Sequence, residues 1–343
     1  MPSVRQPSAP ADPPPYLERA LRGASYEAAR VALDLLDVGV PAHDVIGDLP
    51  APAQQQVGDR WQVNELTVAD EHLATGVASA ALHALASSVA APATGGLVVV
   101  ACAEGDWHGI AAHMFAEQLR SCGFAVAHLG ASTPAEHLAA FVARHRPAAL
   151  AISCNLPLFY AGVSRLANAA HAHGVPVLAG GRAFDGRPER ALRIGADAWA
   201  ADLDESLPIL ASWQQEPPAV ATEPVHLDGV ALELDASAPH IARSAFDDLT
   251  RRFRAVGSYD DAQLARTRED LEFIVQFIAA TRLVGDVTVL TTFLTWLTDL
   301  LAARGVPGRA LEAGLESVRF VLAEVDPSAA ALCDTGLAHL AHA

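Results

Sequence analysis

Five short apolar runs alternate with helical segments between Leu97 and Trp213, and this alternation constrains the fold more than any other feature of the chain. Each run has the length of a strand, and each is followed by a segment long enough for a right-handed crossover helix. The predicted strands are Leu97 to Cys102, Ala125 to Leu129, Ala148 to Ser153, Pro176 to Ala179 and Ala198 to Ala200. The pattern therefore predicts a doubly wound, five-stranded parallel sheet.

Helical patterns precede and follow the sheet region in the sequence. In residues 15–92, apolar or small residues recur three and four apart, which predicts a bundle of about four helices. Residues 225–343 predict an all-helical region of about five helices, and residues 1–14, with five prolines and no apolar periodicity, predict disorder. The fold class is thus α/β plus all-α, with the doubly wound sheet in residues 96–213.

A candidate site follows the first predicted strand, in the stretch Glu104-Gly105-Asp106-Trp107-His108. The carboxyl ends of parallel strands meet at a crevice where open α/β sheets bind ligands. An Asp two residues before a His can hold one imidazole nitrogen, which fixes the tautomer and makes the ring a good metal ligand. Asp106 and His108 are therefore the first candidate binding residues.

Charge and composition exclude several functions. The formal net charge of −17 repels a phosphate backbone, so a nucleic acid is not expected as a partner. All 23 cationic side chains are Arg, which excludes a Schiff-base lysine and a Walker A lysine. No segment is apolar and long enough to span a bilayer, and the N-terminus has no signal-peptide pattern, so we expect a cytoplasmic protein with its four cysteines reduced.

Three motifs in the sheet region resemble the cobalamin-binding domain of methionine synthase, mutases and light-responsive cobalamin repressors. The family motif D-x-H-x-x-G is matched by Asp106 and His108, with Ala111 in place of its last Gly. A Ser after the third strand is matched by Ser153, and a Gly pair after the fourth by Gly180 and Gly181. The resemblance implies that His108 is the lower axial ligand of cobalt and that the other residues hold the nucleotide tail of the corrinoid. The competing interpretation is a flavodoxin-like domain without a cofactor.

The helical bundle resembles the cap of the light-responsive repressors. Trp61, Val68, Glu71 and His72 match the W-x9-E-H pattern of those proteins in type and spacing. The resemblance implies that this bundle covers the upper face of the corrin, with Trp61 over an adenosyl group and Glu71 near its ribose. It therefore implies adenosylcobalamin as the cofactor.

The chain departs from the repressors in two respects. Gln62 stands where many of them have a His that binds cobalt after photolysis, so we do not expect that adduct here. The sequence also has no N-terminal winged helix-turn-helix, and we expect a protein partner for signalling.

The C-terminal region resembles the photocobilins in domain order, helix count and length. Those photoreceptors carry a globin-like domain that binds biliverdin, so the resemblance implies a possible second chromophore here. Haem is disfavoured because no His occurs from Ile241 to Ala338. Cys333 is the one thiol available for a covalent bilin bond. Candidate partners for bilin propionates are Arg251, Arg252, Arg254, Arg266, Arg268 and Arg282.

The leading functional hypothesis is a light sensor, not an enzyme, that forms a homo-oligomer whose state depends on light. Photolysis of the cobalt–carbon bond would remove contacts between the adenosyl group and the cap and shift the packing of the cap. The alternative is a corrinoid carrier subunit of a methyltransferase or mutase, which would need a catalytic partner because the chain encodes no (β/α)8 barrel. A third interpretation makes the C-terminal region an empty dimerisation or signalling module.

Overall fold

The computed structural model describes residues 15–88, 93 and 95–342. The segment 1–14, for which the sequence predicts disorder, lies outside the described residues. The chain forms two compact units, one of residues up to Leu97 together with Ile110–His128, and one of Val98–Gly109 together with Leu129 onwards. No described helix is long and apolar enough to cross a membrane.

The N-terminal bundle has five helices rather than the predicted four or so. They are α1 (Pro15–Leu21), α2 (Ser25–Asp37), α3 (Ala42–Asp48), α4 (Pro50–Gln62) and α5 (Val68–Ser88). The additional short helix arises because each proline interruption starts a helix: Pro41 is the N-cap of α3, and Pro50 occupies the first turn of α4. Proline fits these positions because the first-turn N–H groups have no partner within the helix.

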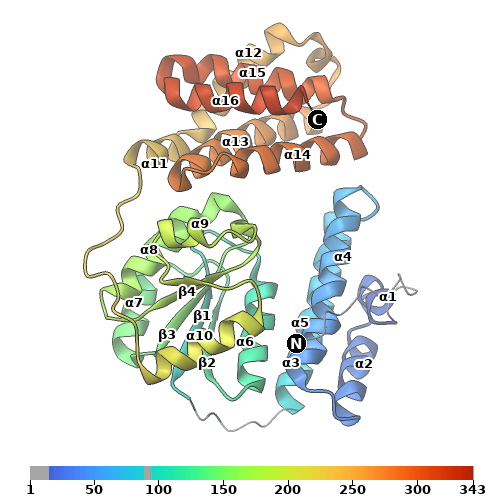
Figure 1. Ribbon diagram of the computed structural model, residues 1–343. Coiled ribbons are helices and arrows are strands. Elements are labelled where there is room, and N and C mark those ends of the chain that lie inside the picture. The colour runs from blue at the N-terminus through green and yellow to red at the C-terminus, as the bar shows by residue number, and fades with distance from the viewer. Residues whose placement is uncertain (1–14, 89–92, 94, 343) are drawn as a thin grey trace. The chain divides into compact units, whose positions relative to one another are not determined.

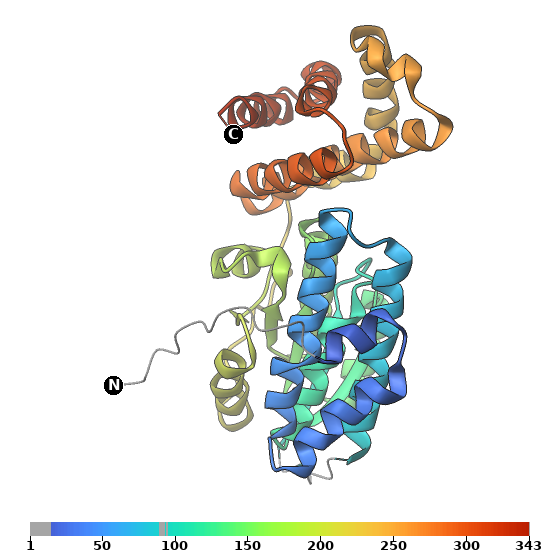
Figure 2. The ribbon, with the colours of Figure 1, turned by 90° about the vertical axis from the view of Figure 1, so that its right-hand side faces the viewer.

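The long helix α5 organises the bundle, with α2 and α4 packed against it (Figure 2). Tyr16 and Leu17 of α1 are buried in one apolar cluster with Val57 and Val77. A second cluster joins Ile46 and Leu82 to residues such as Met114 of α6 (Gly109–Ser121). These two clusters supply the apolar burial that stabilises the bundle.

The five predicted strands are confirmed, each to within a residue or so at its ends. They are β1 (Leu97–Cys102), β2 (Ala125–Gly130), β3 (Ala149–Ser153), β4 (Val177–Gly180) and β5 (Ala198–Trp199). The strand order is β2-β1-β3-β4-β5, and the pairs β1–β3, β3–β4 and β4–β5 are parallel. The central strands are apolar and buried almost throughout, as expected for strands covered on both faces.

Helices and short 3-10 turns connect the strands (Figure 1). After α6 they are α7 (Ala135–His145), η1 (Pro157–Phe159), α8 (Tyr160–His171), η2 (Arg182–Phe184), α9 (Pro188–Arg193) and α10 (Leu203–Gln215). The two 3-10 turns directly follow β3 and β4, so they belong to the carboxyl edge of the sheet.

The C-terminal region is helical, as predicted, with six α-helices where the sequence pattern predicts about five. They are α11 (Gly229–Ala236), α12 (Ala238–Arg252), α13 (Asp261–Val284), α14 (Thr288–Ala303), α15 (Gly308–Val325) and α16 (Pro327–Leu340), with the 3-10 turn η3 (Arg254–Ser258). The additional helix α11 is separated from α12 at Ser237, because Pro239 in the first turn of α12 cannot continue a preceding helix. In this region α12 packs against α13 and α15, and α15 packs against α16.

The buried imidazole of His128 should make the stability of the protein depend on pH. Burial, followed by the neighbouring charges of His113 and Arg120, lowers the pKa of His128 to about 4. The unfolded chain takes up a proton near pH 6.5, whereas the folded chain does not, so stability falls as the pH drops from about 6.5 to about 4. We expect urea unfolding of His128→Leu to lose most of this slope. Exchange of the exposed His137 for Ala should leave the slope unchanged, and an equal slope in all three proteins would contradict the assignment.

A second prediction concerns the contact between α8 and the loop after β1. A Cβ on Gly162 would overlap the carbonyl oxygen of Glu104. We therefore expect Gly162→Ala to destabilise the fold by about 1–3 kcal/mol, as overpacking does in well-packed interiors. The matched control is Gly76→Ala in α5, where a Cβ meets nothing within 4 Å. This control should stabilise the bundle by roughly 0.5–1 kcal/mol in thermal unfolding, and a neutral Gly162→Ala would contradict the packing argument.

Candidate functional site

The loop after β1 carries the Asp–His pair that the sequence predicts. Asp106 is 1% exposed, and its Oδ1 accepts hydrogen bonds from the backbone N–H of His108 at 3.0 Å and from the ring Nδ1 of His108 at 2.7 Å. Its Oδ2 accepts from the backbone N–H of Asn155 at 2.7 Å. The carboxylate thus ties the loop after β1 to the loop after β3 and orients the imidazole.

The orientation of His108 suits metal binding. Because Nδ1–H donates to the carboxylate, the neutral ring carries its lone pair on Nε2. The side chain is 52% exposed, whereas its carboxylate partner is buried. A buried carboxylate behind a half-exposed imidazole is the usual arrangement of a metal-binding His and its supporting group.

The other predicted residues of the sheet lie at the same edge. In the Cα register Cys102 pairs with Ser153, and Ser153 pairs with Gly180, so β1, β3 and β4 end side by side. Among the residues that the structure describes, the Ser153 hydroxyl has no recorded partner, which leaves it able to donate to a ligand. The three family motifs therefore meet at one edge, as the sequence predicts.

Gly181 is required by the backbone itself. Its φ is +108°, and an added Cβ would overlap the carbonyl oxygen of Cys154. The family resemblance assigns the Gly pair to binding of the nucleotide tail, and the structure shows that no side chain fits at Gly181 even without a ligand. The turn η2 after β4 consequently lies close against the loop after β3.

Two features of the edge are not predicted by the sequence motifs. The Ser132 hydroxyl, after β2, accepts from the backbone N–H of Gly105 at 3.1 Å, and the Ser132 N–H donates to the Asp106 carbonyl at 2.8 Å. Glu104 pairs with Arg165 of α8 at 2.5 Å. Ser132 follows a strand end, so the rule that locates Asp106 could also have located Ser132, but the Glu104–Arg165 pair joins distant segments and has no sequence signal.

The thiols beside the site are protonated at neutral pH. Burial, followed by the charge of Asp106, raises the pKa of Cys102 to about 12. Burial likewise raises the pKa of the Cys154 thiol. Neither thiol therefore competes with the imidazole as a thiolate ligand.

The four predicted cap residues gather at one end of the N-terminal bundle. Trp61 lies in the last turn of α4, and Val68, Glu71 and His72 lie in the first turns of α5. Val68 is 53% exposed, and the side chain of His72 is 75% exposed. Glu71 accepts a hydrogen bond from Thr75 Oγ1 at 2.9 Å, which orients its carboxylate. The structure thus brings these four residues together within the bundle.

Several of the candidate bilin residues of the C-terminal region already have partners. Arg282 pairs with Asp326 and Asp228, and Arg252 pairs with Asp248. The Arg268 guanidinium lies 4.1 Å from the ring centroid of Phe246. Cys333 is fully buried, and burial raises the pKa of its thiol to about 12, which disfavours a covalent bilin bond at neutral pH.

The donor set fits a corrinoid rather than a bare metal ion. In the part of the chain that the structure describes, no three His, Cys, Asp or Glu side chains converge on a common point. A corrin ring supplies four nitrogens to its cobalt, so one imidazole completes the lower side. His108, backed by Asp106, is that kind of donor.

Comparison with known proteins agrees with this geometry. Residues 96–210 match a family model described as a B12 binding domain, and residues 15–86 match a second model of the same description. The chain therefore belongs to the corrinoid-binding proteins, with an N-terminal B12-binding cap and a Rossmann-like B12-binding domain. No curated protein matches the chain.

Several solved structures resemble the chain. The monomethylamine corrinoid protein of Methanosarcina barkeri is 21% identical, with a TM-score of 0.48, and the match covers 58% of this chain and 93% of that chain. The methanol:cobalamin methyltransferase complex of the same organism is 18% identical, with a TM-score of 0.34 and coverages of 62% and 84%. A cobalamin-binding protein of Desulfitobacterium hafniense is 21% identical, with a TM-score of 0.32 and coverages of 58% and 96%.

The Asp106 carboxylate yields a test of the site that needs no cofactor. Asp106→Asn should destabilise the protein by about 1–3 kcal/mol in urea unfolding. Both carboxylate oxygens of Asp106 accept from N–H groups, and in Asn one of them becomes an NH₂ group, which would face another donor. Asp185→Asn is the control, since the Asp185 side chain is 52% exposed and Asn tolerates its positive φ. Equal stability of the two variants would contradict the role given to Asp106.

Proposed function

We propose that this protein is a corrinoid carrier in which Asp106 holds His108 as the lower axial ligand of cobalt. The observation that carries the proposal is the Asp106–His108 pair at the edge where Ser153 and Gly180 also end their strands. A bound corrinoid would supply a cobalt atom that can carry a methyl or adenosyl group. Asp106 orients the imidazole, and Ser153 and the Gly180–Gly181 turn would hold the nucleotide tail.

The carrier function needs only the two modules that the family models match. In a carrier, the Rossmann-like domain would hold the corrinoid through His108, and a partner enzyme would react with the bound cofactor. The protein is then not an enzyme by itself, and its partner is the protein that performs the transfer or mutase reaction. The family assignment supports corrinoid binding, and on that basis the carrier is our first candidate.

A light receptor is the second candidate, and the cap residues favour it. A large Trp61 beside the polar Glu71 and His72 suits an adenosyl group better than a methyl group. In this candidate, loss of the adenosyl group on illumination changes the packing of the cap and the oligomeric state. A biliverdin in the C-terminal helical region belongs to this candidate, held by non-covalent contacts because Cys333 is buried.

One loading experiment separates the two candidates. The full chain is loaded in the dark with methylcobalamin or adenosylcobalamin, and the affinity and the size of the complex are measured before and after green light. For a carrier, we expect both cobalamins to bind with similar affinity, Trp61→Ala to change either affinity by less than about threefold, and light to leave the oligomeric state unchanged.

A receptor gives the opposite pattern. Adenosylcobalamin then binds preferentially, Trp61→Ala weakens its binding by tenfold or more, and light changes the size of the complex. Val38→Ala, at a position 76% exposed at the end of α2, is the matched control and should behave as the parent protein. A red absorption band retained after incubation with biliverdin would support the second chromophore, and failure to retain either cobalamin would contradict both candidates.

A further inference from the structure

The C-terminal helical region contacts the loops that hold the proposed corrinoid site. The turn η1, after β3, packs against α13. The ring of Phe159 in this turn lies beside Gly105, next to Asp106. Arg165 binds Glu104 of the loop after β1. Burial raises the pKa of Asp235 in α11, and the charge of Arg165 partly offsets this rise.

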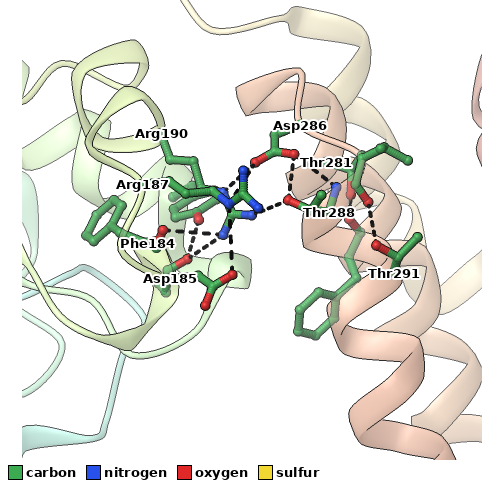
Figure 3. Close-up of polar contacts among 12 residues, drawn as sticks. Phe184, Asp185, Arg187, Arg190, Thr281, Asp286, Thr288 and Thr291 are labelled. Atoms are coloured by element: carbon green, nitrogen blue, oxygen red, sulfur yellow. Dashed lines mark hydrogen bonds and ion pairs between the residues drawn. The ribbon is translucent and has the colours of Figure 1, made fainter.

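Arg190 makes the strongest of these connections (Figure 3). Its side chain is 4% exposed. Nη1 donates to the carbonyls of Ala183 and Phe184, at 3.4 and 3.5 Å, in the turn that directly follows Gly180 and Gly181. Nε donates to Asp286 Oδ2 at 2.9 Å, and Nη2 donates to Thr288 Oγ1 at 2.7 Å. One buried guanidinium is thus shared between the sheet edge and the start of α14.

The partner carboxylate on α14 is held in place by its own helix. Asp286 Oδ1 accepts hydrogen bonds from the Thr288 N–H at 3.0 Å and from Thr288 Oγ1 at 2.6 Å. Burial acts to raise the pKa of Asp286, but the bonds from Thr288 and Arg190 outweigh it and lower the pKa to about 2. The carboxylate therefore stays charged at neutral pH, and it also accepts the first backbone N–H of α14, that of Thr288.

The loop side of the connection is equally constrained. The Tyr160 hydroxyl donates to the Ala183 carbonyl at 2.5 Å, and the Tyr160 ring stacks on Phe184 with centroids 5.6 Å apart. Arg193, one turn beyond Arg190 on α9, donates to the Leu283 carbonyl at the end of α13. A ligand that moves the turn after Gly181 should therefore also shift the guanidinium groups of Arg190 and Arg193, which hydrogen-bond to the start of α14 and the end of α13.

We propose that the C-terminal helical region senses corrinoid binding, because Arg190 couples the position of the Gly181–Phe184 turn to the docking of α14. This inference rests on the corrinoid binding proposed above. A buried guanidinium that loses one set of partners is costly, so the turn and α14 move together. Linkage then requires reciprocity: docking of α14 favours corrinoid binding, and the corrinoid strengthens the docking.

The test changes α14 and leaves the sheet edge intact. Asp286→Asn removes the charge that pairs with Arg190 but keeps an oxygen that can accept the hydrogen bond from the Thr288 N–H. We expect the full-length variant to bind hydroxocobalamin about fivefold or more weakly than the parent protein, measured by absorption titration. We also expect hydroxocobalamin to slow hydrogen exchange in residues 284–292 of the parent protein and not of the variant. Asp299→Asn, an exposed position on the same helix, should match the parent in both measurements.

The outcomes separate this inference from the proposed function. If the parent protein does not bind hydroxocobalamin, the proposed function fails. If the parent binds and Asp286→Asn binds within twofold of it, with the same protection of residues 284–292, the coupling is refuted. If circular dichroism shows that Asp286→Asn is unfolded, Thr288→Val is used instead, because it removes one hydrogen bond from Arg190 and keeps the Asp286 charge. The same weakening of binding and the same loss of protection are then expected.

Discussion

The arrangement of the site depends on one buried carboxylate. Asp106 accepts three hydrogen bonds, two from His108 and one from the backbone of Asn155, and so joins the loops after β1 and β3. A buried charge is stable only when its oxygens are satisfied, so these loops cannot separate without a large cost in free energy. The direction of the imidazole, and with it any binding of cobalt, follows from this local requirement.

The remaining edge of the sheet is arranged around that carboxylate. Ser153 lies between the ends of β1 and β4 in the register, and Gly181 lets the next turn approach the loop after β3. Arg190 of α9 donates to this turn and also reaches Asp286 at the start of α14. Because the Ala183 N–H also donates to the Cys154 carbonyl at 3.2 Å, hydrogen bonds link the loop after β3, through Arg190, to the start of α14.

Much of the fold could be predicted from the sequence, because buried parallel strands are continuous apolar runs and the loops after them carry the polar residues. Asp106 and Ser153 are found by that rule, and the family resemblance adds the role of His108. The helix count was less accurate, since Pro41, Pro50 and Pro239 start helices where a periodicity argument sees only interruptions. Arg190 could not be predicted, because its partners are 96 and 98 residues away and carry no motif.

The central claim is that the imidazole of His108 binds cobalt from below, and one measurement tests it directly. The full chain is labelled with ¹⁵N, loaded with unlabelled cob(II)alamin, and studied by electron paramagnetic resonance. A protein imidazole as the axial ligand splits each cobalt line into two, because ¹⁵N has spin one half, and His108→Ala must abolish this pattern. A three-line splitting from the unlabelled nucleotide base of the cofactor, or a doublet that persists in His108→Ala, would contradict the account.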